Sequence, residues 1–174
     1  MAALSWTAIE DALVAWLESA AGVGAIWANQ TGEQPLMPYG TLKITGPRQS
    51  TPTPEVANVT NLDNPAGQEI EQTVIMRGEI TVSCQVFSQV TAGAGTAREL
   101  LQQARIALFL PARRQALADA GLALVQAGDT QDLTALLETT WQSRAAMDVR
   151  FNVVDTATER TGYIATVNVT GSAT

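Results

Sequence analysis

The sequence predicts an α+β fold in which an antiparallel sheet of about four main strands carries helices packed on one face. Three patterns support this fold class. Residues 70–87 alternate between apolar and polar side chains, as expected of a strand with one buried face. Residues 147–169 alternate in the same way on either side of a polar segment. Residues 6–20 and 96–120 instead repeat apolar side chains at the helical spacing.

The first predicted element is an amphipathic helix over residues 6–20. Thr7 followed by Glu10 fits a capping box at its start, and Gly22 and Gly24 are expected to end it. The residues that share its apolar face are Ile9, Leu13, Trp16 and Leu17. This helix therefore supplies an apolar stripe that can pack on the sheet.

The region after this helix contains one short strand and then a long irregular stretch. Residues 39–45 are predicted to form the strand, with Leu42 and Ile44 on the same side. Residues from about 46 to 69 are predicted to form a long proline-rich loop, because they show little periodicity. The prolines of this stretch are Pro47, Pro52, Pro54 and Pro65.

An overlong strand at about residues 70–87 gives the clearest pattern in the chain. Its even positions are apolar except for Gln72 and Gly78, and its odd positions are mostly polar. Fully extended, such a run spans roughly 55 Å, whereas ordinary strands stop near ~10 residues. Two interpretations follow: Gly78 marks a bulge or bend, or the strand projects beyond its own domain. A projecting strand would suit assembly.

The second half of the chain predicts two helical segments and a terminal hairpin. Thr96 and Glu99 fit a capping box, and Pro111 fits the first position of a further helical segment that stops at Gly121. Residues 122–125 are a candidate short strand, whereas residues 129–137 match no element. The hairpin is predicted from strands at 147–153 and 163–169 with a turn over 155–162.

Composition and charge exclude several classes of protein. Residues 1–174 are expected to form a single domain, since 46% of them are hydrophobic and 16% are charged. A net charge of −7 argues against a surface that grips nucleic-acid phosphates. No stretch reaches the ~18 apolar residues of a membrane span, so we expect no membrane partner. The first residues lack a basic region, which argues against a secretory signal.

The sequence predicts a protein that is not an enzyme and has no catalytic residues, cofactor or metal. It contains no histidine and one cysteine, which removes the commonest general base and the usual zinc ligands. Cys84 lies on the apolar face of the overlong strand and is expected to be a core residue. The segment Gly93–Thr96 precedes a helix and could bind an anion, but a turn with an N-cap explains it better.

A carboxylate hydrolase that works without histidine is a minor alternative. Its candidate pairs are Asp129 with Asp132 and Asp148 with Asp155, chosen only because they lie close in the sequence. A deep pocket that buries two carboxylates would favour this alternative. A second alternative is a monomeric or dimeric binding module, such as an adaptor or an assembly chaperone.

Four segments, in this order along the chain, resemble the neck or tail-terminator proteins of tailed bacteriophages. They are Ile26–Gln30, Pro38–Ile44, Val82–Ser88 and Trp141–Phe151. The order of the helices and strands around them is also similar over nearly the whole chain. The resemblance implies a structural virion protein that forms a ring, hexameric in that family, which caps the tail tube and joins it to the head-side connector.

This resemblance also implies the partners and the location of the protein. The partners would be other copies of the chain, the tail tube protein and the connector proteins of the head. DNA would pass through the lumen without specific binding, since an acidic ring repels it. The protein would be assembled in the cytoplasm of the host bacterium and would reside in the tail or neck of the virion.

The candidate residues for an assembly interface come from three places in the sequence. Trp6 stands at the start of the chain, where an exposed tryptophan would suit an interface. Glu71, Arg77 and Glu79 lie on the polar face of the overlong strand. Arg144 lies within Trp141–Phe151, the segment that carries the resemblance best.

Overall fold

The computed structural model of the protein describes residues 4–30, 35–49, 54–60, 69–89, 96–137 and 140–162. The described chain contains three helices and eight strands. In order they are α1 (Trp6–Ala21), β1 (Gly24–Trp27), β2 (Tyr39–Gln49), β3 (Glu55–Thr60), β4 (Glu69–Gln89), α2 (Ala97–Ala107), α3 (Pro111–Asp119), β5 (Ala123–Ala127), β6 (Gln131–Asp132), β7 (Ala135–Leu137) and β8 (Thr140–Gly162).

All the strands belong to one sheet, ordered β1-β2-β4-β8-β5, with β3 added to β4 and with β6 and β7 added to β8. The α+β class is confirmed, but the expected four main strands are too few for the described chain. The sheet is also not wholly antiparallel, because β1 runs parallel to β2. The extra strands are short and unpatterned. They form because the long strands β4 and β8 offer backbone groups that must be paired.

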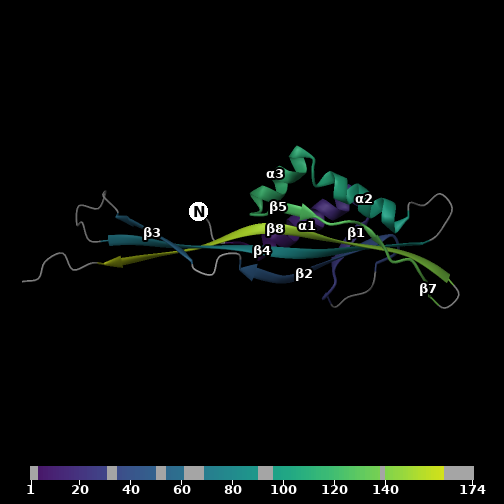
Figure 1. The fold of residues 1–174 in the computed structure, drawn as a ribbon, viewed down its shortest axis with the longest axis horizontal. Helices are drawn as coiled ribbons and strands as arrows, with labels where there is room; N and C mark the ends of the chain where they lie inside the picture. The colour runs from purple at the N-terminus through teal and green to yellow at the C-terminus, as the bar shows by residue number, and fades with distance from the viewer. Residues whose placement is uncertain are drawn as a thin grey trace, which may run out of the picture.

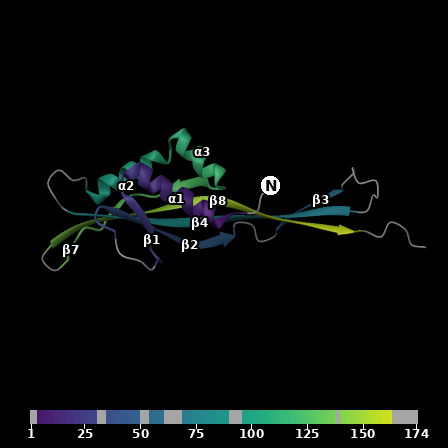
Figure 2. The same ribbon diagram turned by 180° about the vertical axis from the view of Figure 1, so that it is seen from behind.

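The molecule is elongated, with its helices gathered over one part of the sheet. Figures 1 and 2 show α1, α2 and α3 on the same face of the sheet, above the middle of β4 and β8. The paired strands β4 and β8 run on past the helices at one end, where β3 joins them. The helices therefore lie on one face of the sheet, as predicted. They cover only part of that face and leave a bare extension of the sheet.

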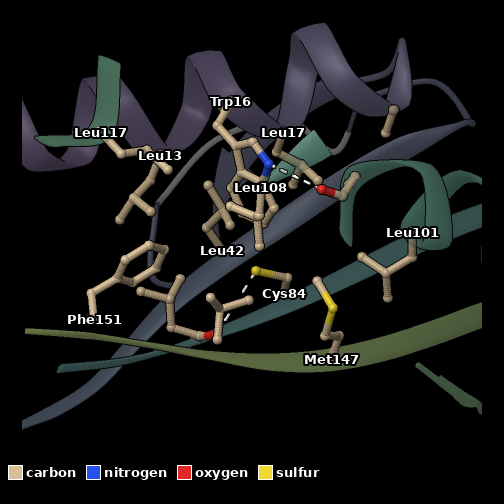
Figure 3. Close-up of a cluster of buried hydrophobic side chains, with 14 of the residues drawn as sticks. Leu13, Trp16, Leu17, Leu42, Cys84, Leu101, Leu108, Leu117, Met147 and Phe151 are labelled. Carbon is tan, nitrogen blue, oxygen red and sulfur yellow. Dashed lines mark hydrogen bonds between the residues drawn. The ribbon is translucent and has the colours of Figure 1, made fainter. Parts of the chain in front are cut away.

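The core lies between the helices and the middle of the sheet (Figure 3). Ile80, Val82, Cys84 and Val86 of β4 are buried, which confirms the predicted register of the overlong strand there. Trp16 is buried as expected, and its indole N–H donates to the carbonyl oxygen of Ala104 at 3.2 Å. This hydrogen bond joins α1 to α2 within the helical layer.

Helix α1 has a capping residue at its start and a glycine at its end. Ser5, not the predicted Thr7, caps it, because the Ser5 hydroxyl accepts the N–H of Ala8 at 3.3 Å. Gly22 ends it in the left-handed conformation, with φ of 68°. The stripe packs closely on β2 at Gly40, where an added Cβ would lie 2.7 Å from Leu17 Cδ2. A side chain at that position would require Leu17 to shift.

Strand β4 is a single continuous strand of 21 residues, slightly longer than predicted. Gly78 pairs with Val153 without a register shift, so it marks no bulge. Strand β4 runs on past the helices in Figure 1, while its projection beyond its own domain stays a prediction. The alternation is buried only from Ile80 onward, since Met76 on the same face is exposed.

Two predicted segments need correction. The expected loop at about 46–69 contains the end of β2 and the whole of β3. The expected turn at 155–162 is instead part of β8, which pairs without interruption with residues 69–76 of β4. Hydrogen bonding along β4 keeps this polar segment extended although its composition resembles a turn. The second strand of the predicted hairpin, at 163–169, lies outside the described residues.

The remaining helices and the first short strand follow their sequence signals. At the start of α2 the Thr96 hydroxyl accepts the N–H of Glu99 and the Glu99 carboxylate accepts the N–H of Thr96, which confirms the capping box. Pro111 is the first residue of α3. Strand β5 matches the predicted strand at 122–125, and the unassigned region 129–137 holds β6 and β7. No helix in the described ranges is long and apolar enough to span a membrane.

Candidate assembly interface

The bare extension of the sheet is the most unusual surface of the molecule. We call it the arm and define it as β3, residues 69–77 of β4 and residues 154–162 of β8. Figure 1 shows that no helix lies over it. Neither β3 nor this part of β8 has a further partner strand among the described residues. A bare three-stranded sheet is marginal by itself and offers two edges for contacts with another molecule.

The helix-side face of the arm is apolar with two carboxylates. The strand register places Val56 beside Val74 and Met76 beside Asp155 on this face. Val56 is 50% exposed and Met76 is 42% exposed, although Met76 continues the row of β4 side chains that is buried under the helices. Asp155 and Glu159 lie on the same face, and neither forms an ion pair with a described residue.

The opposite face of β4 carries three of the predicted interface residues, Glu71 and Arg77 in the arm and Glu79 just beyond it, and each is already paired. Arg77 contacts the Glu55 carboxylate of β3 at 2.7 Å. Glu71 contacts Arg160 at 3.2 Å and Glu79 contacts Arg150 at 3.4 Å, both across to β8. These exposed ion pairs hold neighbouring strands in register but contribute little each. Their role in assembly stays a prediction.

Trp6, the fourth predicted interface residue, lies at the base of the arm. It lines a hollow of about 310 Å³ together with Met76, Arg77 and Asp155. The Asp155 carboxylate accepts the N–H of Leu4 at 3.3 Å, which ties the start of the chain to β8. The structure thus places Trp6 in the same hollow as Met76 and extends the apolar face of the arm toward α1.

Arg144, the fifth predicted interface residue, lies away from the arm on the sheet face without helices. Its guanidinium donates to Gln85 Oε1 at 2.7 Å and lies 5.2 Å from the centre of the Phe87 ring. Phe87 stacks in turn on Tyr39, with 5.0 Å between ring centres. Arg144 therefore packs from β8 onto Gln85 and Phe87 of β4, and its role in an interface stays a prediction.

A second apolar surface, which the sequence analysis did not identify, lies at the corner between α2 and α3. We call it the helix corner and define it by Ile106, Phe109 and Leu110, which are 57%, 58% and 52% exposed. A hollow of about 410 Å³ adjoins it, lined by Phe109, Pro111 and Arg114 among others. The run Ile106-Ala107-Leu108-Phe109-Leu110 was the available signal, because a short helix cannot bury five consecutive apolar residues on one side.

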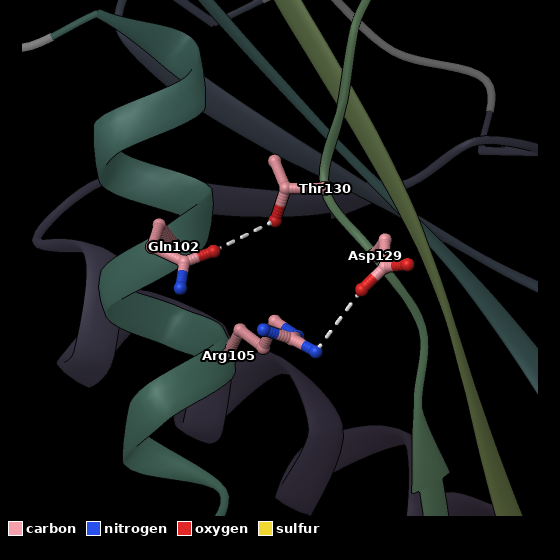
Figure 4. Close-up of polar contacts among 4 residues, drawn as sticks. All are labelled: Gln102, Arg105, Asp129 and Thr130. Carbon is pink, nitrogen blue, oxygen red and sulfur yellow. Dashed lines mark hydrogen bonds and ion pairs between the residues drawn. The ribbon is translucent and has the colours of Figure 1, made fainter.

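The helix corner is held in place by polar contacts between α2 and the segment after β5 (Figure 4). Arg105 contacts the Asp129 carboxylate at 3.3 Å, and the Thr130 hydroxyl donates to Gln102 Oε1 at 3.2 Å. These contacts fix α2 against the edge of the sheet. The apolar side chains at the end of α2 are consequently exposed on a helix that is anchored to the sheet.

The candidate carboxylate pairs do not form a site. Asp129 is paired with Arg105, and Asp132 accepts the hydroxyl and the N–H of Thr134, which lower the pKa of Asp132. Asp148 and Asp155 lie on opposite faces of β8, separated by roughly 23 Å at the usual rise of a strand. Neither pair buries two carboxylates in one pocket.

The other candidate chemical groups are accounted for by packing and capping. Cys84 is fully buried, and burial raises the pKa of its thiol well above the usual range. The Glu99 carboxylate occupies the first turn of α2, where an anion would bind, and residues 93–95 lie outside the described chain. The described residues contain no group of three or more potential ligands that could hold a metal ion.

Comparison with known proteins assigns the chain to a family. Residues 7–174 match the family model described as phage neck terminator protein. This match covers nearly the whole chain. The protein therefore belongs to the phage neck terminator family, which confirms the family resemblance of the sequence. No protein with a curated description matches the chain.

Proposed function

We propose that the protein is a structural component of the head–tail junction of a tailed bacteriophage. Copies of the chain form a ring, hexameric as in the proteins that it resembles, which caps the tail tube. The ring joins the tube to the connector of the head, and DNA passes through its lumen. The match of residues 7–174 to the phage neck terminator family carries this proposal.

The arm and the helix corner support the assembly part of the proposal. Exposed apolar surfaces of this kind mark places where another protein binds. A ring requires two different surfaces on each copy, so that each interface is satisfied when the rotation closes. The chain offers two such surfaces, on separate parts of the fold.

The charge of the protein supports passage of DNA without binding. With a net charge of −7, the protein should not retard duplex DNA in a gel at ~150 mM salt, whatever the DNA sequence. An electrophoretic mobility assay with duplexes of different sequence measures this directly. Retardation at that salt concentration would contradict the proposed lumen, since it requires a basic surface that holds phosphates.

The proposed location is tested by labelling purified virions. Gold-conjugated antibodies against the protein should label the point where head and tail meet in electron micrographs. Unattached tails should carry the label at their head-proximal end, and unattached heads should carry none, because the ring caps the tube. Label along the tail shaft, or absence of the protein from virions, would favour an assembly chaperone instead.

A further inference from the structure

We propose that the arm of one copy docks on the helix corner of the next copy, so that the apolar residues Val56 and Met76 cover Phe109 and Leu110. This inference rests on the proposed function, since it names the contact through which the copies assemble. The molecule that binds the bare face of the arm is a second copy of this chain.

The first argument is that each surface lacks a cover within its own chain. The helices end before the arm, so Val56 and Met76 stay exposed although they lie on the sheet face that is buried farther along β4. Ile106, Phe109 and Leu110 are each more than half exposed, beside a hollow that can receive a side chain. The arm continues β4 and β8 away from the helices and cannot turn back onto α3 of its own chain.

The second argument is charge complementarity. Asp155 and Glu159 give the helix-side face of the arm two carboxylates that form no ion pair with a described residue. Arg113 and Arg114 follow the helix corner, and neither forms an ion pair within the described chain. Two acidic and two basic side chains therefore accompany the two apolar surfaces, which favours this pairing over contact between like surfaces.

A third apolar surface is a weaker partner for the arm. Leu136 and Trp141 are exposed at the β7 end of the sheet, opposite the arm in Figure 1. The described charged residues closest to them along the chain are of both signs, namely Asp132 and Arg144. This surface consequently offers no excess of positive charge to meet Asp155 and Glu159.

The geometry of the proposed contact is head-to-tail. The arm and the helix corner are different surfaces, so each copy uses one of them toward each neighbour. Repeated in one direction from copy to copy, such a contact closes into a ring or continues as a filament, whereas two copies that exchanged arms would stop at a two-fold dimer. The proposal therefore predicts covalent ladders, not dimers, when the two surfaces are cross-linked.

Cysteine cross-linking in virions tests the contact. A phage without the gene is complemented with the double variant Val56→Cys/Leu110→Cys, and purified particles are treated with a short thiol-specific cross-linker. We expect a ladder of covalent multimers on a denaturing gel. Each single variant should stay monomeric, and so should Val56→Cys/Leu136→Cys, which pairs the arm with the β7 end. Buried Cys84 should give no background.

The outcomes separate the contact from the function. If wild-type protein restores joined particles but the double variant in such particles gives no ladder, the docking proposal is wrong and the function stands. A dimer from Val56→Cys alone, or a ladder from the Leu136 variant, also contradicts it. Failure of wild-type protein to restore joining would instead overturn the proposed function.

Charge reversal provides an independent test if the cysteine variants do not assemble. Asp155→Arg/Glu159→Arg and Arg113→Glu/Arg114→Glu should each lower the number of joined particles at least roughly tenfold, because like charges then face each other. Combining the four substitutions should restore most of the joined particles. A combination no better than either pair alone would contradict the contact.

Discussion

Replacing Val82 by Asp should destabilise the protein by roughly 3 to 5 kcal/mol, at the severe end for a single substitution. Val82 is fully buried in the middle of β4, between Ile44 of β2 and Val149 of β8. An aspartate there would be buried without a basic partner or would be protonated at a cost. We expect a fall in Tm of about 10 °C or more, measured by circular dichroism or calorimetry.

Thr81→Asp is the matched control for this substitution. Thr81 lies one residue earlier, on the sheet face without helices, and its partner in β8 is Arg150. An aspartate at this position stays near water and faces a guanidinium, so the expected cost is below about 1 kcal/mol. Equal losses of Tm for Val82→Asp and Thr81→Asp would show that the assigned faces of β4 are wrong.

Deleting the gene from the phage should abolish infectious particles through a specific defect. Filled heads and tails should accumulate separately, because the ring that joins them is missing. The tails should have abnormal or uncontrolled lengths, because nothing caps the tube. Electron microscopy of the lysate measures both effects. Normal, joined particles from the deletion would contradict the junction assignment and favour the adaptor alternative.

The middle of the fold could be predicted from the sequence because local signals there agree with the packing. The alternation of β4 from Ile80 onward and the apolar stripe of α1 both match the buried core. The capping box at Thr96 and the proline at the start of α3 likewise coincide with the ends of helices. Each of these signals lies within a few residues of the element that it defines.

The arm could be predicted only in part because long-range pairing determines it. Strand β3 follows prolines and has no periodicity of its own, so only its pairing with β4 makes it a strand. Residues 155–162 are rich in polar and turn-forming side chains, yet β4 keeps them extended. A run that is unpatterned locally can still form a strand when a neighbouring strand supplies its hydrogen bonds.

The candidate interface could likewise be predicted only where local sequence signals decide it. An exposed position for Trp6 was expected from its place at the start of α1, but its position in one hollow with Met76 depends on how α1 packs over the sheet. The helix corner was missed because the run from Ile106 to Leu110 could also have been core. The exposure of Ile106, Phe109 and Leu110 depends on the path of the chain between α2 and α3.

The central claim is that the protein joins heads to tails, and adding the purified protein to separate heads and tails tests it most directly. Lysate from the deletion phage, which contains separate heads and tails, is mixed with the purified full-length chain, and infectious particles are counted against a buffer control. The account predicts a large rise in joined, infectious particles with wild-type protein and with Thr81→Asp. The account would be contradicted if folded wild-type protein gave no rise in joined, infectious particles. This result counts only if the heads and tails in the same lysate are still able to join by other means.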